Sequence, residues 1–215
     1  MSKRPAKRSV FAVLLRRALL GLGLVAGLAA TSPIWAGVDG ATYEPVGAAT
    51  SVPYGWVDFC QRYKGECTAR AAAPADIVLT ARTMREIQRI NAWVNKNIEA
   101  VSDMDHWGVV DQWDYPTDGK GDCEDYALLK RRMLMERGFP MSALLMTVVK
   151  DKNGDGHAIL TVKTDRGDFV LDNLSEDVKG WNKTGYRFVK RQSQNDQNAW
   201  VSIGEPTAAP AYVSR

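Results

Sequence analysis

The chain has few of the residues and segments on which several protein classes depend. Its 215 residues include only three cysteines and two histidines. Cys60 and Cys67 have no second cysteine or histidine cluster nearby that would complete a metal site. The apolar run from Ala18 to Ala30 has 13 residues, which is too short to cross a bilayer comfortably. A permanent membrane anchor is therefore a weaker interpretation than a cleaved leader.

The N-terminal region has the order of charge and hydrophobicity of a secretory signal peptide. Residues 1–17 carry six basic side chains and no acidic one, the apolar run follows, and a small residue stands at Ala36. We expect residues 1–36 to be removed on export, which predicts a periplasmic protein. Without them the chain has 22 basic and 25 acidic residues, a net charge of −3, so nothing indicates a nucleic-acid partner.

The remaining 179 residues are enough for one domain with a full core. Residues 37–52 are rich in Gly, Ala and Thr with little periodicity, which predicts an extended segment. Residues 205–215 have a similar composition and predict a flexible tail. We therefore place the folded domain at residues 53–204.

The three cysteines have unequal prospects of pairing. Cys60 and Cys67 are close enough in sequence to bridge in an oxidising compartment, and a loop this short would stabilise the fold by only about 2 kcal/mol. Cys123 is then a lone thiol in an exported protein, which makes it the best candidate for a nucleophile. The alternative is a buried structural cysteine, because free cysteine behaves as a small hydrophobic residue.

The first strong periodic signal is helical. Apolar residues at three- and four-residue steps over residues 80–101 predict an amphipathic helix of about six turns. Thr83 and Glu86 have the spacing of a capping box near its start. Trp93 on this helix is interpreted as a packing residue.

A loop and a second helix follow. Residues 103–118 hold Trp107 and Trp113 among polar residues, and predict a structured loop that either walls a cleft or covers the core. Asp122 is a predicted N-cap for a helix that stops before Gly138. Apolar residues spread around more than one face of this helix, so we expect it to be central and largely buried.

Short strands dominate the later part of the chain. The alternation of apolar and polar residues predicts four strands joined by turns, at residues 143–150, 157–163, 168–172 and 186–190. Helices followed by an antiparallel sheet predict an α+β fold, with the helix that begins near Cys123 packed on the sheet.

His157 is the better placed of the two histidines to act as a base. If Thr164 and Gly167 pair across the turn between two predicted strands, His157 and Asp172 fall on one face, diagonal to each other and within hydrogen-bonding reach. Asp172 would then orient the imidazole. A slip of one residue would send Asp172 to the other face, and each residue alone is also compatible with an ordinary structural role. His106, in the predicted loop, has no such partner in this scheme.

Three stretches of the chain are similar to one known family. They are Gly121-Asp122-Cys123-Glu124-Asp125-Tyr126-Ala127, His157-Ala158-Ile159-Leu160 and Leu171-Asp172-Asn173-Leu174. These motifs resemble the bacterial transglutaminase-like cysteine proteinases, which include periplasmic proteases that release biofilm adhesins from the cell surface. The resemblance runs from about residue 53 to residue 203.

The resemblance implies a fold and roles for individual residues. It implies a papain-like fold in which Cys123 is the nucleophile, His157 the general base and acid, and Asp172 the residue that orients His157. It also implies a protein substrate such as a large cell-surface adhesin, and an inner-membrane regulatory receptor as a partner. In the adhesin-releasing members, acidic neighbours of the nucleophile bind calcium, which corresponds here to Asp122 and Glu124.

A cation beside Cys123 is also reasonable on electrostatic grounds. Three carboxylates flank the thiol, and one of them at about 6 Å with an effective dielectric near 20 disfavours the thiolate by about 2.8 kcal/mol. A calcium ion held by these oxygens would cancel that penalty. The alternative is that acidic residues in a first helical turn only complement the helix dipole.

The function expected from these observations is a calcium-dependent periplasmic cysteine peptidase with a Cys-His-Asp triad. A lysine or another amine as acceptor would make the same residues a transglutaminase-like acyltransferase, because both reactions share an acyl-enzyme. A third alternative is a calcium-dependent binding module that keeps the fold without turnover.

Overall fold

The structure, a computed structural model, describes residues 43–68, 73–204 and 209–213. The predicted signal peptide at residues 1–36 lies outside the described residues. Within the described part of the chain, no helix is both long enough and apolar enough to cross a membrane.

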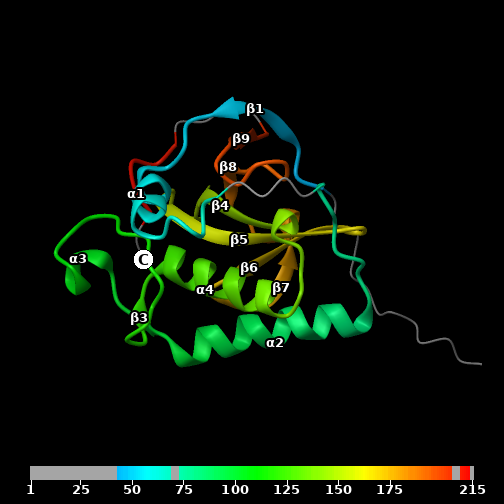
Figure 1. Cartoon of the computed structure of the whole chain (residues 1–215), viewed down its shortest axis with the longest axis horizontal. Coiled ribbons are helices and arrows are strands. Elements are labelled where there is room, and N and C mark those ends of the chain that lie inside the picture. The colour runs from blue at the N-terminus through cyan, green and yellow to red at the C-terminus, as the bar shows by residue number, and fades with distance from the viewer. Residues whose placement is uncertain (1–42, 69–72, 205–208, 214–215) are drawn as a thin grey trace, which may run out of the picture. The chain divides into compact units, whose positions relative to one another are not determined.

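A seven-stranded antiparallel sheet forms the centre of the domain (Figure 1). Its strand order is β1-β9-β8-β4-β5-β6-β7. The strands are β1 Val46–Thr50, β4 Leu144–Lys150, β5 Gly156–Thr164, β6 Gly167–Asp172, β7 Ser175–Gly180, β8 Arg187–Gln192 and β9 Trp200–Ile203. The sequence predicts β4, β5, β6 and β8 to within two residues at each end. It does not predict β9, which is short, or the edge strands β1 and β7, which carry few apolar residues.

Helices pack on one face of this sheet. The helices are α1 Tyr54–Arg62, α2 Ala81–Asn97, α3 Asp103–His106 and α4 Cys123–Glu136, with 3₁₀ turns at Met141–Ala143 and Trp181–Lys183. Figure 1 shows α4 lying between the sheet and α2. The α+β prediction, with the helix that begins at Cys123 packed on the sheet, is confirmed.

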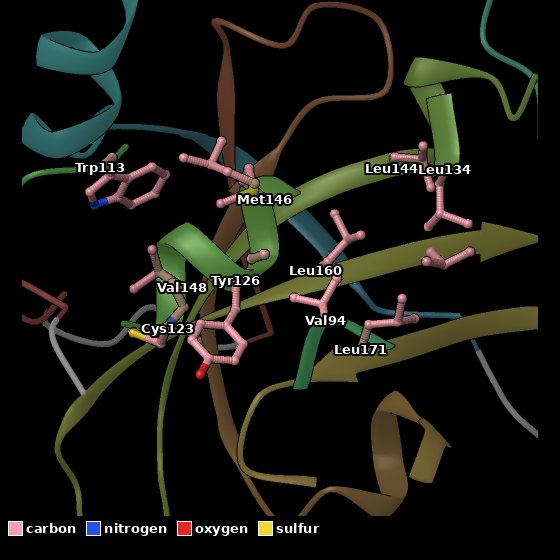
Figure 2. Close-up of a cluster of buried hydrophobic side chains, with 14 of the residues drawn as sticks. Val94, Trp113, Cys123, Tyr126, Leu134, Leu144, Met146, Val148, Leu160 and Leu171 are labelled. Atoms are coloured by element: carbon pink, nitrogen blue, oxygen red, sulfur yellow. Dashed lines mark hydrogen bonds between the residues drawn. The ribbon is translucent and has the colours of Figure 1, made fainter. Parts of the chain in front are cut away.

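The main hydrophobic core lies between α4 and the sheet. Figure 2 shows side chains of α4, β4, β5 and β6 meeting there, with Cys123 and Trp113 at one end of the cluster. Trp113 is completely buried, whereas Trp107 is about half exposed at 48%. Of the two roles predicted for residues 103–118, walling a cleft or covering the core, Trp113 has the second. Trp107 faces outward and does not cover the core.

The helix predicted over residues 80–101 is shorter than expected and has a different cap. Thr80 is the N-cap, and its hydroxyl accepts a hydrogen bond from the backbone N–H of Thr83, whose hydroxyl accepts from Thr80 in return. The prediction of a box between Thr83 and Glu86 is therefore wrong, since Glu86 instead pairs with Arg89 and Arg137. Trp93 is 48% exposed, so its interpretation as a packing residue is also wrong.

The early end of α2 has a cause that matters for the site. Strand β2, Glu99–Ala100, pairs in parallel with β3, Lys120–Gly121, so the chain cannot remain helical beyond Asn97. This short pairing brings together the two ends of the loop at residues 101–119 and places residue 122 directly beside the start of that loop.

The cysteine pairing is as predicted. Cys60 and Cys67 form a disulfide with their Cα atoms 5.4 Å apart, and Cys123 is a free, buried thiol. The segments predicted as extended or flexible are partly ordered. Residues 46–50 form β1 at the edge of the sheet, and Val213 is buried at 3% exposure.

Candidate active site

The first turn of α4 carries the candidate nucleophile. Asp122 is the N-cap in extended conformation, and Cys123 is the first helical residue, as predicted. Gly121 allows the turn to close tightly, because a Cβ atom on it would lie 2.6 Å from Oδ2 of Asp125. Asp125 is fixed in turn by the backbone N–H of Asp114, which donates to its Oδ1 at 2.7 Å.

The thiol of Cys123 is enclosed by polar partners. Its side chain is 1% exposed, and Sγ donates a hydrogen bond to Oε2 of Glu124 at 3.2 Å. The backbone N–H of Ala158 donates to the same sulfur at 3.3 Å. Strand β5 is therefore held directly against the first turn of α4, which brings the residue before Ala158, His157, beside the thiol.

His157 and Asp172 are joined as the predicted strand register requires. Thr164 pairs with Gly167 and Leu160 with Leu171, which is the register assumed from the sequence. Nε2 of His157 lies 2.9 Å from Oδ1 of Asp172, and His157 is fully buried. Among the described residues, the second ring nitrogen, Nδ1, is buried without a hydrogen-bond partner other than Cys123, which interacts with the ring.

The charges of the three residues support one another. Burial by itself lowers the pKa of His157, but the negative charge of Cys123 and the hydrogen bond to Asp172 outweigh it and raise that pKa to about 10. Burial tends to raise the pKa of Asp172, yet its hydrogen bonds to His157 and Tyr186 hold the pKa below its usual value. The raised pKa favours the imidazolium form of His157, with Asp172 ionised behind the ring.

Asp172 is held by more than His157. The Tyr186 hydroxyl donates to its Oδ2 at 2.6 Å, and the backbone N–H of Leu174 donates to its Oδ1 at 3.0 Å. The Tyr186 ring also packs edge-on against His157, with ring centroids 5.6 Å apart. Sequence reasoning places Tyr186 at the start of a predicted strand but misses its role, because no periodic pattern points it toward the site; in the structure it lies directly before β8.

Five buried or half-buried carboxylates gather beside the thiol. Three groups of ligand atoms each lie within 4.8 Å of one another: Asp122, Cys123 and Glu124; Asp103, Asp111 and Glu124; and Asp103, Asp122 and Asp125. We call Asp103, Asp111, Asp122, Glu124 and Asp125 the acidic cluster. The structure brings Asp122 and Glu124 into it as predicted, and adds acids from the loop before α4.

The acidic cluster holds more negative charge than its surroundings favour. Burial raises the pKa of Asp103 and of Asp111 to about 6, and burial together with neighbouring acids raises the pKa of Asp125 to about 9. The pKa of Glu124 is raised well above its usual value by burial, by Cys123 and by Asp122. Ion pairs found among the described residues do not include Asp103, Asp111, Glu124 or Asp125.

The donor set of this cluster fits a hard divalent cation. Carboxylate oxygens are the ligands that calcium takes in its flexible shell of six to eight oxygens. Within the part of the chain that the structure describes, one oxygen of Glu124, Oε1, is buried without a hydrogen-bond partner, so it has a lone pair to offer. Such a cation would offset both the burial and the mutual repulsion that disfavour the ionised carboxylates.

The other histidine has different neighbours. Nε2 of His106 lies 2.8 Å from Oδ2 of Asp118, and its ring stacks on Trp107 with centroids 3.8 Å apart. Both partners belong to the loop at residues 101–119. The structure therefore places His157, and not His106, against Cys123 and Asp172.

A free thiol at the start of a buried helix, facing a histidine and a carboxylate from an antiparallel sheet, is the arrangement expected of a transglutaminase-like cysteine peptidase. Residues 46–208 match the family described as bacterial transglutaminase-like cysteine proteinase, BTLCP. The chain belongs to this family, which makes it a cysteine peptidase of the transglutaminase-like type. No curated protein sequence matches it.

Solved structures of LapG from Legionella pneumophila are similar to part of the chain. The calcium-bound structure is 22% identical, with a TM-score of 0.47, over 59% of this chain and 74% of that chain. Another LapG structure is 24% identical, with a TM-score of 0.47, over 55% and 68% of the two chains. An EGTA-treated LapG structure is 23% identical, with a TM-score of 0.46, over 57% and 71%.

Proposed function

We propose that the protein is a periplasmic cysteine endopeptidase in which Cys123 is the nucleophile, His157 the general base and acid, and Asp172 the residue that orients His157. The observation that carries this proposal is the buried relay from Asp172 Oδ1 to His157 Nε2, 2.9 Å apart, with the opposite ring nitrogen left for the thiol. The raised pKa of His157 supports the same assignment, because it favours the ion pair that attacks a carbonyl.

The reaction follows from these positions. The Cys123 thiolate attacks the carbonyl carbon of a peptide bond, and backbone N–H groups in the first turn of α4 stabilise the oxyanion. The His157 imidazolium donates its proton to the leaving amine, which departs and leaves a thioester on Cys123. A water molecule then attacks the thioester while His157 takes one of its protons, and the acid product leaves with the thiolate restored.

We propose that the acidic cluster holds calcium, with Asp122 and Glu124 among its ligands. Its supporting observation is a set of buried carboxylates whose pKa values are raised by burial and by one another, and of which Glu124 and Asp125 form no ion pair among the described residues. Bound calcium would supply electrostatic support for the thiolate. The residues themselves fix the turn at Gly121 and hold the backbone of the preceding loop, since Asp103 and Asp125 accept from the N–H groups of Gln112 and Asp114.

The cellular setting rests on the sequence. Residues 1–36 are proposed as a signal peptide that directs the domain to the periplasm, with the folded domain at 53–204 as its working part. Membership of a proteinase family implies a protein substrate. The resemblance to adhesin-releasing proteases favours a large surface adhesin as that substrate and an inner-membrane receptor as the regulator.

Acyl transfer to an amine is the second candidate, and burial is the observation that favours it. Cys123 and His157 are 1% and 0% exposed, so the thioester would form in a site that limits water. Product analysis separates the two reactions: hydrolysis releases an acid, whereas transfer joins an added lysine analogue to the substrate. Chelation would weaken both reactions alike.

The peptidase proposal is tested by changing the two histidines in parallel. Cys123→Ala should abolish hydrolysis of a protein substrate while circular dichroism stays unchanged. His157→Ala should lower turnover by at least about 10²-fold, as for loss of a positioned acid and base, and the control His106→Ala should change it little. Turnover by Cys123→Ala at a tenth of the parent rate, or a reversed order of the histidine variants, would refute the assignment.

A further inference from the structure

A cavity of about 270 Å³ borders the acidic cluster, and the C-terminal segment of the chain forms one of its walls. In Figure 1 this segment is the red stretch that passes α1. The other walls come from the loop before α4, from the residues that lead into α1, and from β4 and β8. The lining residues used below are Asp111, Trp113 and Val148, together with Pro210, Tyr212 and Val213.

Val213 anchors the segment on the side of the acidic cluster. Its side chain is 3% exposed and belongs to the core cluster that contains Trp113 and Cys123. Its backbone N–H donates a hydrogen bond to the carboxylate of Asp111. Asp111 in turn has an oxygen within 4.8 Å of one from Glu124, which accepts a hydrogen bond from the thiol. The backbone of Val213 is thus separated from the Cys123 thiol by two carboxylates.

The same segment reaches the histidine side of the site. A Cβ atom on Gly156 would lie 2.3 Å from the carbonyl oxygen of Tyr212 and 2.8 Å from Cβ of Pro210. Only glycine leaves room for this approach, and Gly156 immediately precedes His157. Residues 209–213 therefore run from the residue beside His157 to a carboxylate that adjoins Glu124, so they bridge the two halves of the site.

The reacting atoms themselves are closed off from solvent. With Cys123 at 1% and His157 at 0% exposure, no peptide carbonyl can reach the thiol unless a covering segment moves. Residues 209–213 form neither helix nor strand, and Ala209, Ala211 and Tyr212 are exposed. The burial of Val213 is the main contact that holds them, so this segment is easier to displace than the strands around it.

We propose, on the basis of the peptidase function above, that the position which the chain's own residues Ala209–Val213 occupy along this cavity is a peptide-binding subsite of the enzyme. Its ligand is an extended peptide of a protein substrate that places a small aliphatic side chain where Val213 lies and donates a backbone N–H to Asp111. The intramolecular segment competes with such a peptide, and the substrate enters when the segment leaves.

The test compares two variants of the whole mature protein that introduce the same charge at neighbouring positions. Val213→Asp places a carboxylate in the buried position, whereas Tyr212→Asp, the matched control, places it on a side chain that is 54% exposed. Val213→Asp should raise the rate of Cys123 alkylation by iodoacetamide at least about tenfold, because an unpaired buried charge is expelled. Tyr212→Asp should stay within about twofold of the parent, because its charge remains in water.

A truncated protein that ends at Gly204 keeps the test decisive if Val213→Asp unfolds. It should show the same fast alkylation, and a synthetic peptide with the sequence Ala-Pro-Ala-Tyr-Val should slow it again. Alkylation that is equal in the truncated and parent proteins would overturn the subsite.

The two proposals can fail separately. Faster alkylation of the truncated protein, with peptide protection but no hydrolysis of any protein, would support the subsite and refute the peptidase. Hydrolysis by the parent at the same rate as by the truncated protein would support the peptidase and refute the intramolecular occupant.

Discussion

Two buried clusters of charged residues lie on opposite faces of the sheet, and they differ in whether each charge has a partner of opposite sign. On the face away from α4, Glu44 Oε2 pairs with Arg191 Nε at 2.9 Å, and Lys163 Nζ pairs with Asp168 Oδ1 at 2.8 Å. Thr161 adds a hydroxyl that donates to Glu44 at 2.9 Å. Each buried charge in this balanced cluster has a partner of opposite sign.

The acidic cluster on the α4 side has no such balance. Its carboxylates contact one another, the thiol and backbone N–H groups, and Asp103, Asp111, Glu124 and Asp125 form no ion pair among the described residues. Burial raises pKa values in both clusters, that of Glu44 to about 7, so the clusters differ in their ion pairs. A balanced buried cluster can persist for structure alone, whereas an unbalanced one lowers stability unless a cation joins it. The difference supports the proposed calcium role of the acidic cluster, whereas the balanced cluster holds Glu44 against the sheet.

Breaking the balanced cluster should have the largest effect on stability. Glu44→Ala leaves Arg191 buried without its partner and should lower the free energy of unfolding by about 3–5 kcal/mol. The double variant Glu44→Leu with Arg191→Met should recover much of that loss, since it removes both charges. Denaturant unfolding measures both. A loss below about 1 kcal/mol for Glu44→Ala would mean that the pair is not a structural element.

Removing calcium should change the electrostatics of the acidic cluster and leave the balanced cluster unchanged. In chelator, the alkylation of Cys123 at neutral pH should fall about 100-fold, and its pH profile should move up by about two units, as one uncompensated carboxylate near the thiolate requires. Added calcium should restore it, and magnesium less, because magnesium demands a tighter octahedral shell. Asp122→Ala and Glu124→Ala should lose this sensitivity to chelator. Superimposable profiles would remove the metal from the proposal.

The acidic cluster also predicts the direction of a pH effect on stability. Because the folded pKa of Asp125 is raised to about 9, its contribution in chelator is present below about pH 4 and is lost as the pH rises through 9. Calcium, which favours ionised ligands, should flatten this decline. Unfolding curves at several pH values with and without chelator measure the difference. A decline of equal slope in both conditions would contradict a calcium site.

Two buried lysines, Lys130 and Lys163, allow a test in which the expected changes in stability are smaller but opposite in sign. Lys130 Nζ has no hydrogen-bond partner among residues 43–68, 73–204 and 209–213, and burial lowers the pKa of Lys130 to about 7, although Asp172 partly opposes the shift. The unfolded chain therefore binds an extra proton between about pH 7 and 10, so stability rises across that range. Lys130→Met should add about 1–2 kcal/mol at pH 7 and remove the slope.

Lys163 is the matched control for Lys130. It has a partner, Asp168, at 2.8 Å, so Lys163→Met should destabilise the fold by leaving a buried carboxylate alone. If both substitutions stabilise the fold, the ion pair between Lys163 and Asp168 does not contribute to stability. If both substitutions destabilise the fold, the Lys130 ammonium stabilises the native state even though it makes no hydrogen bond.

The comparison also shows what the sequence can predict. The thiol, His157 and Asp172 are predictable because each lies in or beside an element with a strong local signal, and because the turn at Thr164 and Gly167 fixes the register between two strands. Asp122 and Glu124 follow from the motif around Cys123.

Other parts depend on contacts between distant segments, which no local pattern encodes. Asp103 and Asp111 join the cluster because β2 pairs with β3 and folds the intervening loop back on α4. The balanced cluster needs Glu44, from a segment with no periodicity, to meet Arg191 far along the chain. Strand β1 is exposed along its whole length, so it lacks the alternation that marks a strand.

The pairing of β1 with β9 affects when the substrate groove can form. Val46 lies opposite Ile203, so this edge of the sheet closes only after the long stretch of chain between these two residues has been made and threaded. Residues 51–54, which follow β1 directly, wall the groove. A partly synthesised or partly exported chain would therefore carry its thiol without a finished place for a substrate. On the proposed function, late closure of this long-range strand pair would delay proteolysis until this edge of the sheet has formed.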